Sequence, residues 1–350
     1  MNATPEPGTV SAPHMRRFNF DVTNTIDVSS VAAVRQAVCE LYAARWPKAT
    51  LDELWIAFHD FERLYTGHMP GFEGCDTVYH DIQHTLDMTL TMARLVAGYE
   101  RSADADEQLG PERAVLGIVC ALFHDAGYIR ESGDTRYRNG AEYTRWHVSR
   151  SAKFLRNLLP RIGLSAFADI AAEMVHFTGY EKALTDIALD DPLDSMTGHL
   201  LGTADLVAQM SDRCYLEKCR DRLYPEFVLG GVAITQEGGG VQKVRYQSGT
   251  DLLLQTPAFY RDVVKKRLDV EFNKAYRYIE VLFNGFNPYM QFIERNMAYL
   301  EHIIETGEWP ALRRMPPCYT VNENPVLVAN MLVNRRIAAL RAEAMVLAGA

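Results

Sequence analysis

The sequence lacks the long apolar runs that membrane-spanning helices need. No stretch of about 18 consecutive apolar residues occurs in the chain of 350 residues, so we expect no transmembrane helix. The opening MNATPEPGTV also lacks the apolar centre of a secretory signal peptide. We therefore expect no membrane partner, and the cytoplasm is the expected location.

The chain also lacks a surplus of positive charge. It has 36 Lys and Arg against 45 Asp and Glu, which gives a formal net charge of −9. An acidic protein has no general attraction for a phosphate backbone, so long nucleic acid is not an expected partner. A small anionic substrate stays open, because a bound metal ion reverses the local sign of the charge.

Several motifs of other enzyme classes are missing. The six cysteines form no C-x-x-C pair, and we expect them to be reduced and packed as small apolar side chains. The glycine triplet 238–240 lacks the G-x-x-x-x-G-K-[ST] pattern of a phosphate-binding loop. No G-x-S-x-G nucleophile elbow is visible either. The pattern of residues therefore indicates neither a P-loop nor a serine nucleophile on such an elbow.

Apolar residues recur mainly at three- and four-residue steps, which predicts helices. The first begins at Val31, with Ser29 or Ser30 placed as its N-cap. The predicted helical segments are 31–42, 52–65, 81–99, 111–126, 139–159, 165–177, 197–222, 257–283, 288–306 and 325–347. Strand signals are scarce, and only 228–247 indicates a small β-hairpin. We therefore predict an all-α helical bundle with one hairpin.

The chain divides into three predicted parts. Residues 1–18 are poor in aliphatic side chains and are expected to form a flexible tail. Residues 19–310 are expected to form a single helical domain, with its core motifs in 79–212. Residues 311–350 form an extension with one long helix, whose apolar stripe either packs internally or contacts a second copy in a homodimer.

Histidines are few but unevenly placed. The chain has ten, and five of them lie between residues 80 and 176. His80 and His84 are four residues apart and therefore share one face of a helix. Neutral imidazoles at that spacing can converge on one centre, such as a metal ion.

A second group stands at the end of an apolar segment. The stretch LGIVCALFHDAGY is apolar almost all round, so we expect a buried helix that ends at His124 and Asp125. A buried imidazole and carboxylate are costly unless something satisfies them, and a metal ion does so. Asp205 lies in a similar apolar segment, LGTADLV.

The order His84, His124-Asp125, Asp205 resembles the H…HD…D signature of the HD-domain metal-dependent phosphohydrolases. The segment YHDIQHTLDM is similar to the Y-H-N-x-x-H-A-x-D-V motif of class I cyclic nucleotide phosphodiesterases, with Asp81 where those enzymes have Asn. The resemblance covers about residues 79–212. It implies an HD-type helical catalytic domain in which these four residues bind a first metal ion.

The resemblance also implies roles for two neighbours of His84. His80 matches the histidine that protonates the leaving oxygen in the phosphodiesterases. Asp87 matches the later Asp of the motif, which would orient a nearby imidazole by accepting its N–H. Both are therefore expected to be catalytic residues.

A second metal ion is implied by two further histidines. His147 and His176 follow the HD pair in the order seen in the binuclear branches of the superfamily. In those branches the aspartate of the HD pair bridges two ions, so Asp125 would share the second ion with these histidines. The expected cofactors are two divalent metal ions, and Mn, Fe, Zn, Mg and Ni all stay open.

The activity implied by the resemblance is hydrolysis of a phosphoester, either a nucleotide-like phosphodiester or a phosphomonoester. A metal-activated water would attack phosphorus while His80 acts as general acid. The expected partner is a small anionic phosphate-containing substrate. Two alternatives stay open: a di-iron oxygenase acting on a small molecule, and a metal-bound sensor without catalysis. Imidazole and carboxylate donors suit all three.

Overall fold

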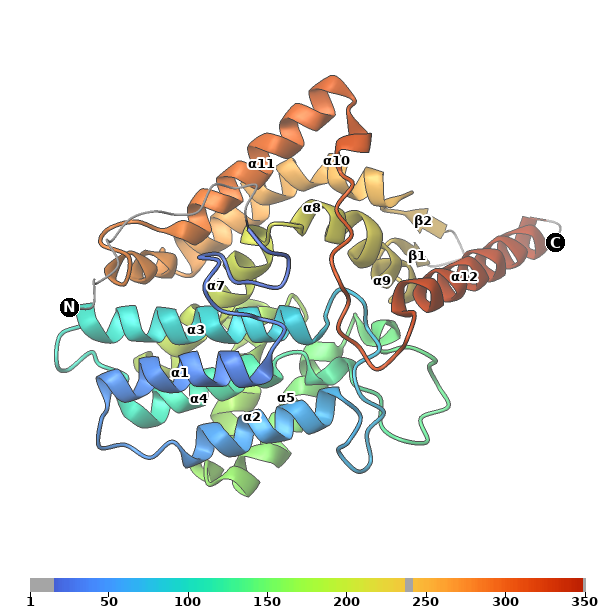
Figure 1. Cartoon of the computed structure of the whole chain (residues 1–350). Helices are drawn as coiled ribbons and strands as arrows, with labels where there is room; N and C mark the ends of the chain where they lie inside the picture. The colour runs from blue at the N-terminus through green and yellow to red at the C-terminus, as the bar shows by residue number, and fades with distance from the viewer. Residues whose placement is uncertain (1–15, 237–241, 349–350) are drawn as a thin grey trace.

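The computed structural model describes residues 16–236 and 242–348, and these are mostly helical, as predicted (Figure 1). The helices are α1 (Val31–Arg45), α2 (Asp52–Tyr65), α3 (Ile82–Ser102), α4 (Gly110–Phe123), α5 (His147–Leu158), α6 (Ala168–Met174), α7 (Pro192–Ser211), α8 (Tyr215–Lys218), α9 (Tyr224–Leu229), α10 (Gly249–Phe259), α11 (Pro288–Thr306) and α12 (Pro325–Ala348). Two short strands, β1 (Ile234–Gln236) and β2 (Gln242–Val244), pair antiparallel where the hairpin was expected. The all-α fold class is therefore confirmed for the described residues.

Helix α3 is the centre of the bundle. It packs against α1, α4 and α7 (Figure 1), and its buried residues lie on all of its sides. Its buried threonine hydroxyls donate hydrogen bonds to backbone carbonyls one turn earlier, as Thr89 Oγ1 does to the Thr85 carbonyl at 2.7 Å. Helices α4 and α7 are also rich in buried apolar residues. These three helices carry His84, His124 and Asp205 into one buried region.

The start of α3 is set by a side-chain cap. The Asp81 carboxylate accepts the backbone N–H of His84 at 3.1 Å, which satisfies one of the free donors of the first turn. His84 therefore lies in the first turn of a buried helix, where its position is fixed. Ser30 caps α1 in the same way, as the sequence predicted.

The predicted helix 139–159 is wrong in its first half. A 3-10 turn, Gly140–Tyr143, comes first, and it begins with a capping box formed by Asn139 and Glu142. Helix α5 begins only at His147. The apolar pattern continues through the break, which is why periodicity alone did not reveal it. His147 consequently stands at a helix start and not in a helix middle.

The predicted helix 197–222 is also interrupted. Helix α7 ends at Ser211 because Asp212 takes an extended conformation. The Asp212 carboxylate then accepts the Cys214 N–H at 2.6 Å and pairs with Lys218 Nζ at 2.5 Å. This turn starts α8 in a new direction.

The predicted helix 257–283 is likewise not a regular α-helix. It consists of π-helical turns at Tyr260–Val264 and Arg267–Glu271 and a 3-10 segment at Ala275–Val281. The 3-10 segment packs against α3.

The described N-terminal end of the chain lies against the body. Arg16, inside the predicted tail 1–18, is buried and donates to the Ser211 carbonyl at 3.3 Å. Residues 16–18 therefore belong to the folded part, and the rest of that predicted tail lies outside the described residues. After α11 the chain runs across the molecule to α12, and α12 packs on α9 (Figure 1).

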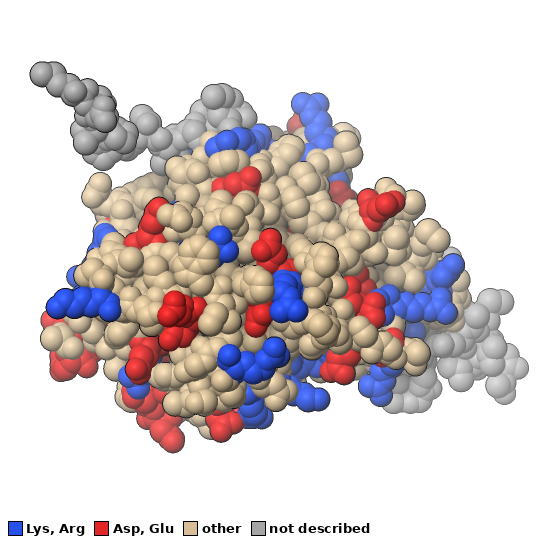
Figure 2. All heavy atoms as spheres, turned by 60° about the horizontal axis from the view of Figure 1, so that its bottom comes forward, with Lys and Arg blue, Asp and Glu red and all other residues tan. Residues whose placement is uncertain are grey.

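The lengths of the helices and the charges on the surface relate to two partners considered from the sequence, a membrane and long nucleic acid. Among the described residues, no helix has both the length and the apolar character needed to cross a membrane. Acidic and basic side chains are interspersed over the face shown in Figure 2. That face carries no continuous basic area.

The close approach of α3 to the 3-10 segment depends on a glycine. A Cβ atom at Gly98 would lie 1.9 Å from the Tyr278 carbonyl oxygen, which is backbone and cannot move aside easily. We expect Gly98→Ala to lower the free energy of unfolding by about 1–3 kcal/mol or more, through overpacking. Thermal unfolding checks this, with Arg101→Ala, at an exposed residue in the last turn of α3, as the control. An unchanged Tm for Gly98→Ala would contradict this packing.

Candidate metal centre

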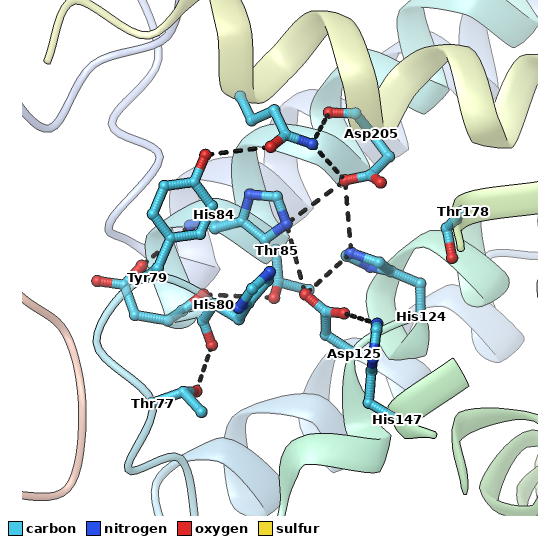
Figure 3. Close-up of polar contacts among 12 residues, drawn as sticks. Thr77, Tyr79, His80, His84, Thr85, His124, Asp125, His147, Thr178 and Asp205 are labelled. Atoms are coloured by element: carbon cyan, nitrogen blue, oxygen red, sulfur yellow. Dashed lines mark hydrogen bonds and ion pairs between the residues drawn. The ribbon is translucent and has the colours of Figure 1, made fainter. Parts of the chain in front are cut away.

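Three helices deliver four side chains to one point in the core (Figure 3). His84 comes from the first turn of α3, and Asp205 comes from the middle of α7. His124 and Asp125 follow the last residue of α4, where the chain turns into a short 3-10 segment. All four are at least nine-tenths buried.

The distances within this group are those of a compact donor cluster. One donor atom each from His84, His124 and Asp205 lies within 4.8 Å of the others. Asp125 Oδ2 lies 3.4 Å from His84 Nε2 and 3.1 Å from His124 Nε2. Asp205 Oδ1 lies 3.5 Å and 3.8 Å from the same two nitrogens. The two Nε2 atoms therefore face two carboxylate oxygens.

Hydrogen bonds outside the cluster orient His124 and Asp205. His124 Nδ1 donates to the Ala121 carbonyl at 2.8 Å, which leaves Nε2 without a proton when the ring is neutral. The Asp205 carboxylate is held by Gln209, whose Nε2 lies 3.4 Å from Oδ1, and Gln209 in turn accepts the Tyr79 hydroxyl at 3.1 Å. These supports fix the direction in which the donors point.

The cluster contains polar atoms that the protein leaves unsatisfied. His124 Nε2 and Asp125 Oδ2 are buried and lie 3.1 Å apart as an ion pair, but neither makes a hydrogen bond of good geometry among the described residues. Such atoms cost free energy in a low-dielectric core. A cation at this point would satisfy both, and two imidazoles with two carboxylates are donors that divalent transition metals accept. The buried group of His84, His124 and Asp205 could therefore hold a metal ion.

The charged groups of the cluster shift the pKa values of His124 and Asp125. Burial alone would lower the pKa of His124, but the Asp125 carboxylate outweighs it and raises that pKa to about 9. For Asp125, burial alone would raise the pKa, but His124 and then His80 hold it well below its ordinary value. In the metal-free protein a proton on His124 thus occupies the place that a cation would take.

His147 approaches the cluster from the side of Asp125. Its Nε2 lies 3.7 Å from Asp125 Oδ1, the oxygen that faces away from His84. Its Nδ1 donates to the Thr144 carbonyl at 2.8 Å. The Glu181 carboxylate accepts the N–H groups of Val148 and Ser149, which anchors the start of α5. His147 and Asp125 therefore form an adjoining pair of donors.

His176 does not join this network of contacts. It lies in the 3-10 turn Val175–Thr178, and its buried Nδ1 has no partner among the described residues. Burial lowers the pKa of His176, and the charges that act on it are those of Lys182, Glu181 and Glu173 rather than that of Asp125. The structure thus brings five of the six predicted metal ligands together and leaves His176 apart.

His80 stands beside the cluster and is paired with an acidic residue. Its ring centroid lies 5.6 Å from that of His84, and its Nδ1 lies 2.5 Å from Glu226 Oε2. Burial alone would lower the pKa of His80, but the Glu226 carboxylate raises it above its ordinary value. Glu226 comes from α9 and is itself buried. The pairing with Glu226 therefore favours the protonated form of His80.

An aromatic ring lies against both His80 and His147, whose own ring centroids are 6.2 Å apart. Tyr128 stacks on both imidazoles, with ring centroids 4.5 Å from His80 and 4.3 Å from His147. Its interplanar angles are 20° and 16°. The ring thus fixes how far apart the two histidines lie.

Asp87 lies behind the cluster. It lines a polar cavity of about 20 Å³ that also touches His84, and that volume suits about one water molecule. Asp87 Oδ1 is buried and has no hydrogen-bond partner among the described residues. Burial, together with the charges of Asp21 and Asp212, raises the pKa of Asp87 to about 7. No hydrogen bond joins Asp87 to an imidazole among the described residues, so its predicted orienting role is not seen as a direct contact.

Sequence reasoning missed three residues of this region. Glu226 is separated from His80 by 146 positions, and no local pattern links them. Gln209 lies one helical turn after Asp205, so its spacing alone was an available signal. Tyr128 comes three residues after Asp125, but nothing in its position predicts a stack against two imidazoles.

Comparison with protein-family models, with curated proteins and with solved structures finds no match to this chain. The interpretation of the site therefore depends on its own geometry.

Metal binding at this centre should be coupled to proton release. A cation must displace the proton that Asp125 holds on His124, whose pKa is raised to about 9. The apparent affinity for Mn²⁺ or Zn²⁺ should therefore rise by roughly tenfold per pH unit between pH 7 and 9 for one displaced proton, and level off above that.

Competition with a chelator of known pH dependence measures this slope. His68→Ala, which changes an exposed histidine away from the cluster, should show the same slope as the wild type. An affinity that does not change over this pH range would contradict the assignment of His124 as a ligand.

Proposed function

We propose that the protein is a metal-dependent hydrolase of the HD superfamily that cleaves a phosphoester. The observation that carries the proposal is His80, paired with Glu226 at 2.5 Å beside a buried cluster of two imidazoles and two carboxylates. A general acid next to a metal-ligand set is what hydrolysis of an ester with a poor leaving group requires.

The first metal ion would be held by His84, His124, Asp125 and Asp205. A second would lie on the other oxygen of Asp125, which His147 faces at 3.7 Å. His176 would complete that second site by a shift of its 3-10 turn. Two divalent ions, when bound, would supply an activated water and neutralise charge on the phosphoryl oxygens. The nitrogen and oxygen donors suit Mn, Fe, Zn and Ni, and Mg less well.

His80 would act as the general acid. Its Nδ1 is occupied by Glu226, so the free edge of the ring carries the Nε2 proton. The Glu226 carboxylate, which raises the pKa of His80, favours that proton, and the proton would pass to the leaving oxygen of the ester. Glu226 is the positioning residue of this pair, because it fixes both the charge and the orientation of the ring.

Asp87 would act indirectly. The polar cavity places it next to His84 without direct contact, and a water in that cavity would join the two side chains. Such a water-mediated contact would hold the His84 ring in the orientation that directs Nε2 to the metal.

The substrate class follows from the charges of the site. The cluster itself carries two carboxylates, so an anion would bind only once metal ions have reversed the local sign. A small phosphate-containing molecule, diester or monoester, fits such a centre. The cluster alone does not separate the two ester types.

The competing interpretations use the same ligands. A di-iron oxygenase would employ the same imidazoles and carboxylates, and a metal-bound sensor would need no more than these. The His80–Glu226 pair favours hydrolysis, because it supplies a proton to a leaving group and neither alternative needs one there.

Substitution of His80 tests the proposal. We expect His80→Ala to lower kcat on an alkyl phosphoester by about 10²–10⁴-fold, the usual contribution of a general acid, while the metal content stays that of the wild type. The measurement pairs a hydrolysis screen over p-nitrophenyl phosphate, bis-p-nitrophenyl phosphate and cyclic nucleotides with elemental analysis. The matched control is His59→Ala, an exposed histidine on α2. Two irons in the wild type with no phosphate release from any substrate would contradict hydrolysis and favour the oxygenase.

A further inference from the structure

The chain between α11 and α12 forms a strap that packs against the segment leading into α3. Residues 312–321, here called the C-terminal strap, contain no helix or strand. They follow the 3-10 turn at Trp309–Ala311. The strap descends across the molecule from the end of α11 to the start of α12 (Figure 1). It passes the segment 74–81, here called the His80 loop, which leads into α3.

Backbone hydrogen bonds join the strap to the His80 loop. The Val321 N–H donates to the Cys75 carbonyl at 2.9 Å. The Tyr319 N–H donates to Asp81 Oδ2 at 3.0 Å, and the Tyr319 carbonyl accepts the Ile82 N–H at 3.3 Å. The strap thus contacts both the beginning and the end of the His80 loop.

An arginine joins the strap to the loop a second time. Arg222 NH1 lies 3.8 Å from Asp81 Oδ2, and NH2 donates to the carbonyls of Pro316 and Pro317. Arg222 is 4% exposed and Asp81 is 1% exposed. Because water does not reach them, a hydrogen bond that either loses to the strap would not be replaced by solvent. The two residues therefore bind the strap through buried, charge-assisted contacts.

The opposite side of the His80 loop is held by α9. Glu226 accepts the Tyr79 N–H at 2.6 Å with one oxygen and contacts His80 with the other. Helix α9 in turn packs against α12, which the strap leads into. Glu226 and the strap therefore both bind the His80 loop. The strap also contacts Arg222, just before α9, and α12 packs on α9, which carries Glu226.

We propose that the C-terminal strap is a positioning element for the His80–Glu226 pair, so that the proton-donating step depends on residues 312–321. The role in catalysis rests on the proposed function of His80 as general acid. Of the four ligands of the first metal ion, only His84 is linked to the strap, through the Asp81 cap of α3. His124 and Asp125 at the end of α4 and Asp205 in α7 are anchored elsewhere, so the strap should affect proton donation more than metal binding.

Two variants loosen the strap in different ways. Arg222→Gln removes the charge that joins Asp81 to the two proline carbonyls. Val321→Pro removes the N–H that Cys75 accepts and replaces a side chain that lies beside Gly74. Residue 321 is 42% exposed and belongs to no helix or strand, so the fold should tolerate the change. Arg261→Gln, which breaks an exposed pair with Glu301, is the matched control.

The first measurement is hydrogen–deuterium exchange on the full metal-free chain. Both strap variants should speed exchange in the peptide covering 74–82 by at least about tenfold, because the Ile82 and Tyr79 amides lose protection, and the control should not. The second measurement uses the metal-loaded protein. Turnover of an alkyl phosphoester should fall about tenfold or more, whereas turnover of the matching p-nitrophenyl ester, whose leaving group needs no proton, should change little.

Three outcomes would overturn the proposal: unchanged exchange in 74–82, an equal loss on both substrates, or a loss of bound metal in both strap variants. If the wild type hydrolyses neither substrate, the proposed function fails. The exchange measurement then decides by itself whether the strap supports the His80 loop. Faster exchange in both variants then supports the strap as the support of the His80 loop, and unchanged exchange refutes it.

Discussion

The structure depends on burying two carboxylates and their imidazole partners among apolar helices. Asp125 and Asp205 are at least nine-tenths buried, and Asp125 Oδ2 has no hydrogen-bond partner among the described residues. The transfer of such charges from water is costly unless opposite charge meets them. In the metal-free protein the protonated His124 meets part of that need. A divalent cation would meet it more fully, because it would accept lone pairs from all of these donors at once.

The remaining architecture holds these donors in place. Asp81 has a double role: one oxygen caps α3 at His84, and the other accepts the Tyr319 N–H of the strap. A metal ligand and the C-terminal extension are therefore linked through a single carboxylate. On the far side of the cluster, Tyr79 and Gln209 hold Asp205 in the same manner. The apolar helices set positions, and these few buried polar contacts set directions.

Sequence reasoning succeeded where the signal was local and periodic. The bounds of α2 and α11 agree with the predicted segments. The H…HD…D residues lie together because they stand in, or directly after, the largely buried helices α3, α4 and α7. It failed where a polar side chain ends a helix without breaking the apolar pattern, as Asp212 does after α7. The partners of His80 could not be predicted, since Glu226 and the strap reach it from positions far along the chain. His176 remains apart from the cluster, so its place in a second metal site stays a prediction.

The most direct test of the account is the metal content per chain of the wild type beside Asp125→Ala, both purified from metal-replete cells. Asp125 lies between His124 on one oxygen and His147 on the other, so its loss removes the donor that two ions would share. The account predicts about two divalent ions per chain in the wild type and almost none in Asp125→Ala. A wild type without metal, or a variant that retains the full content, would contradict it.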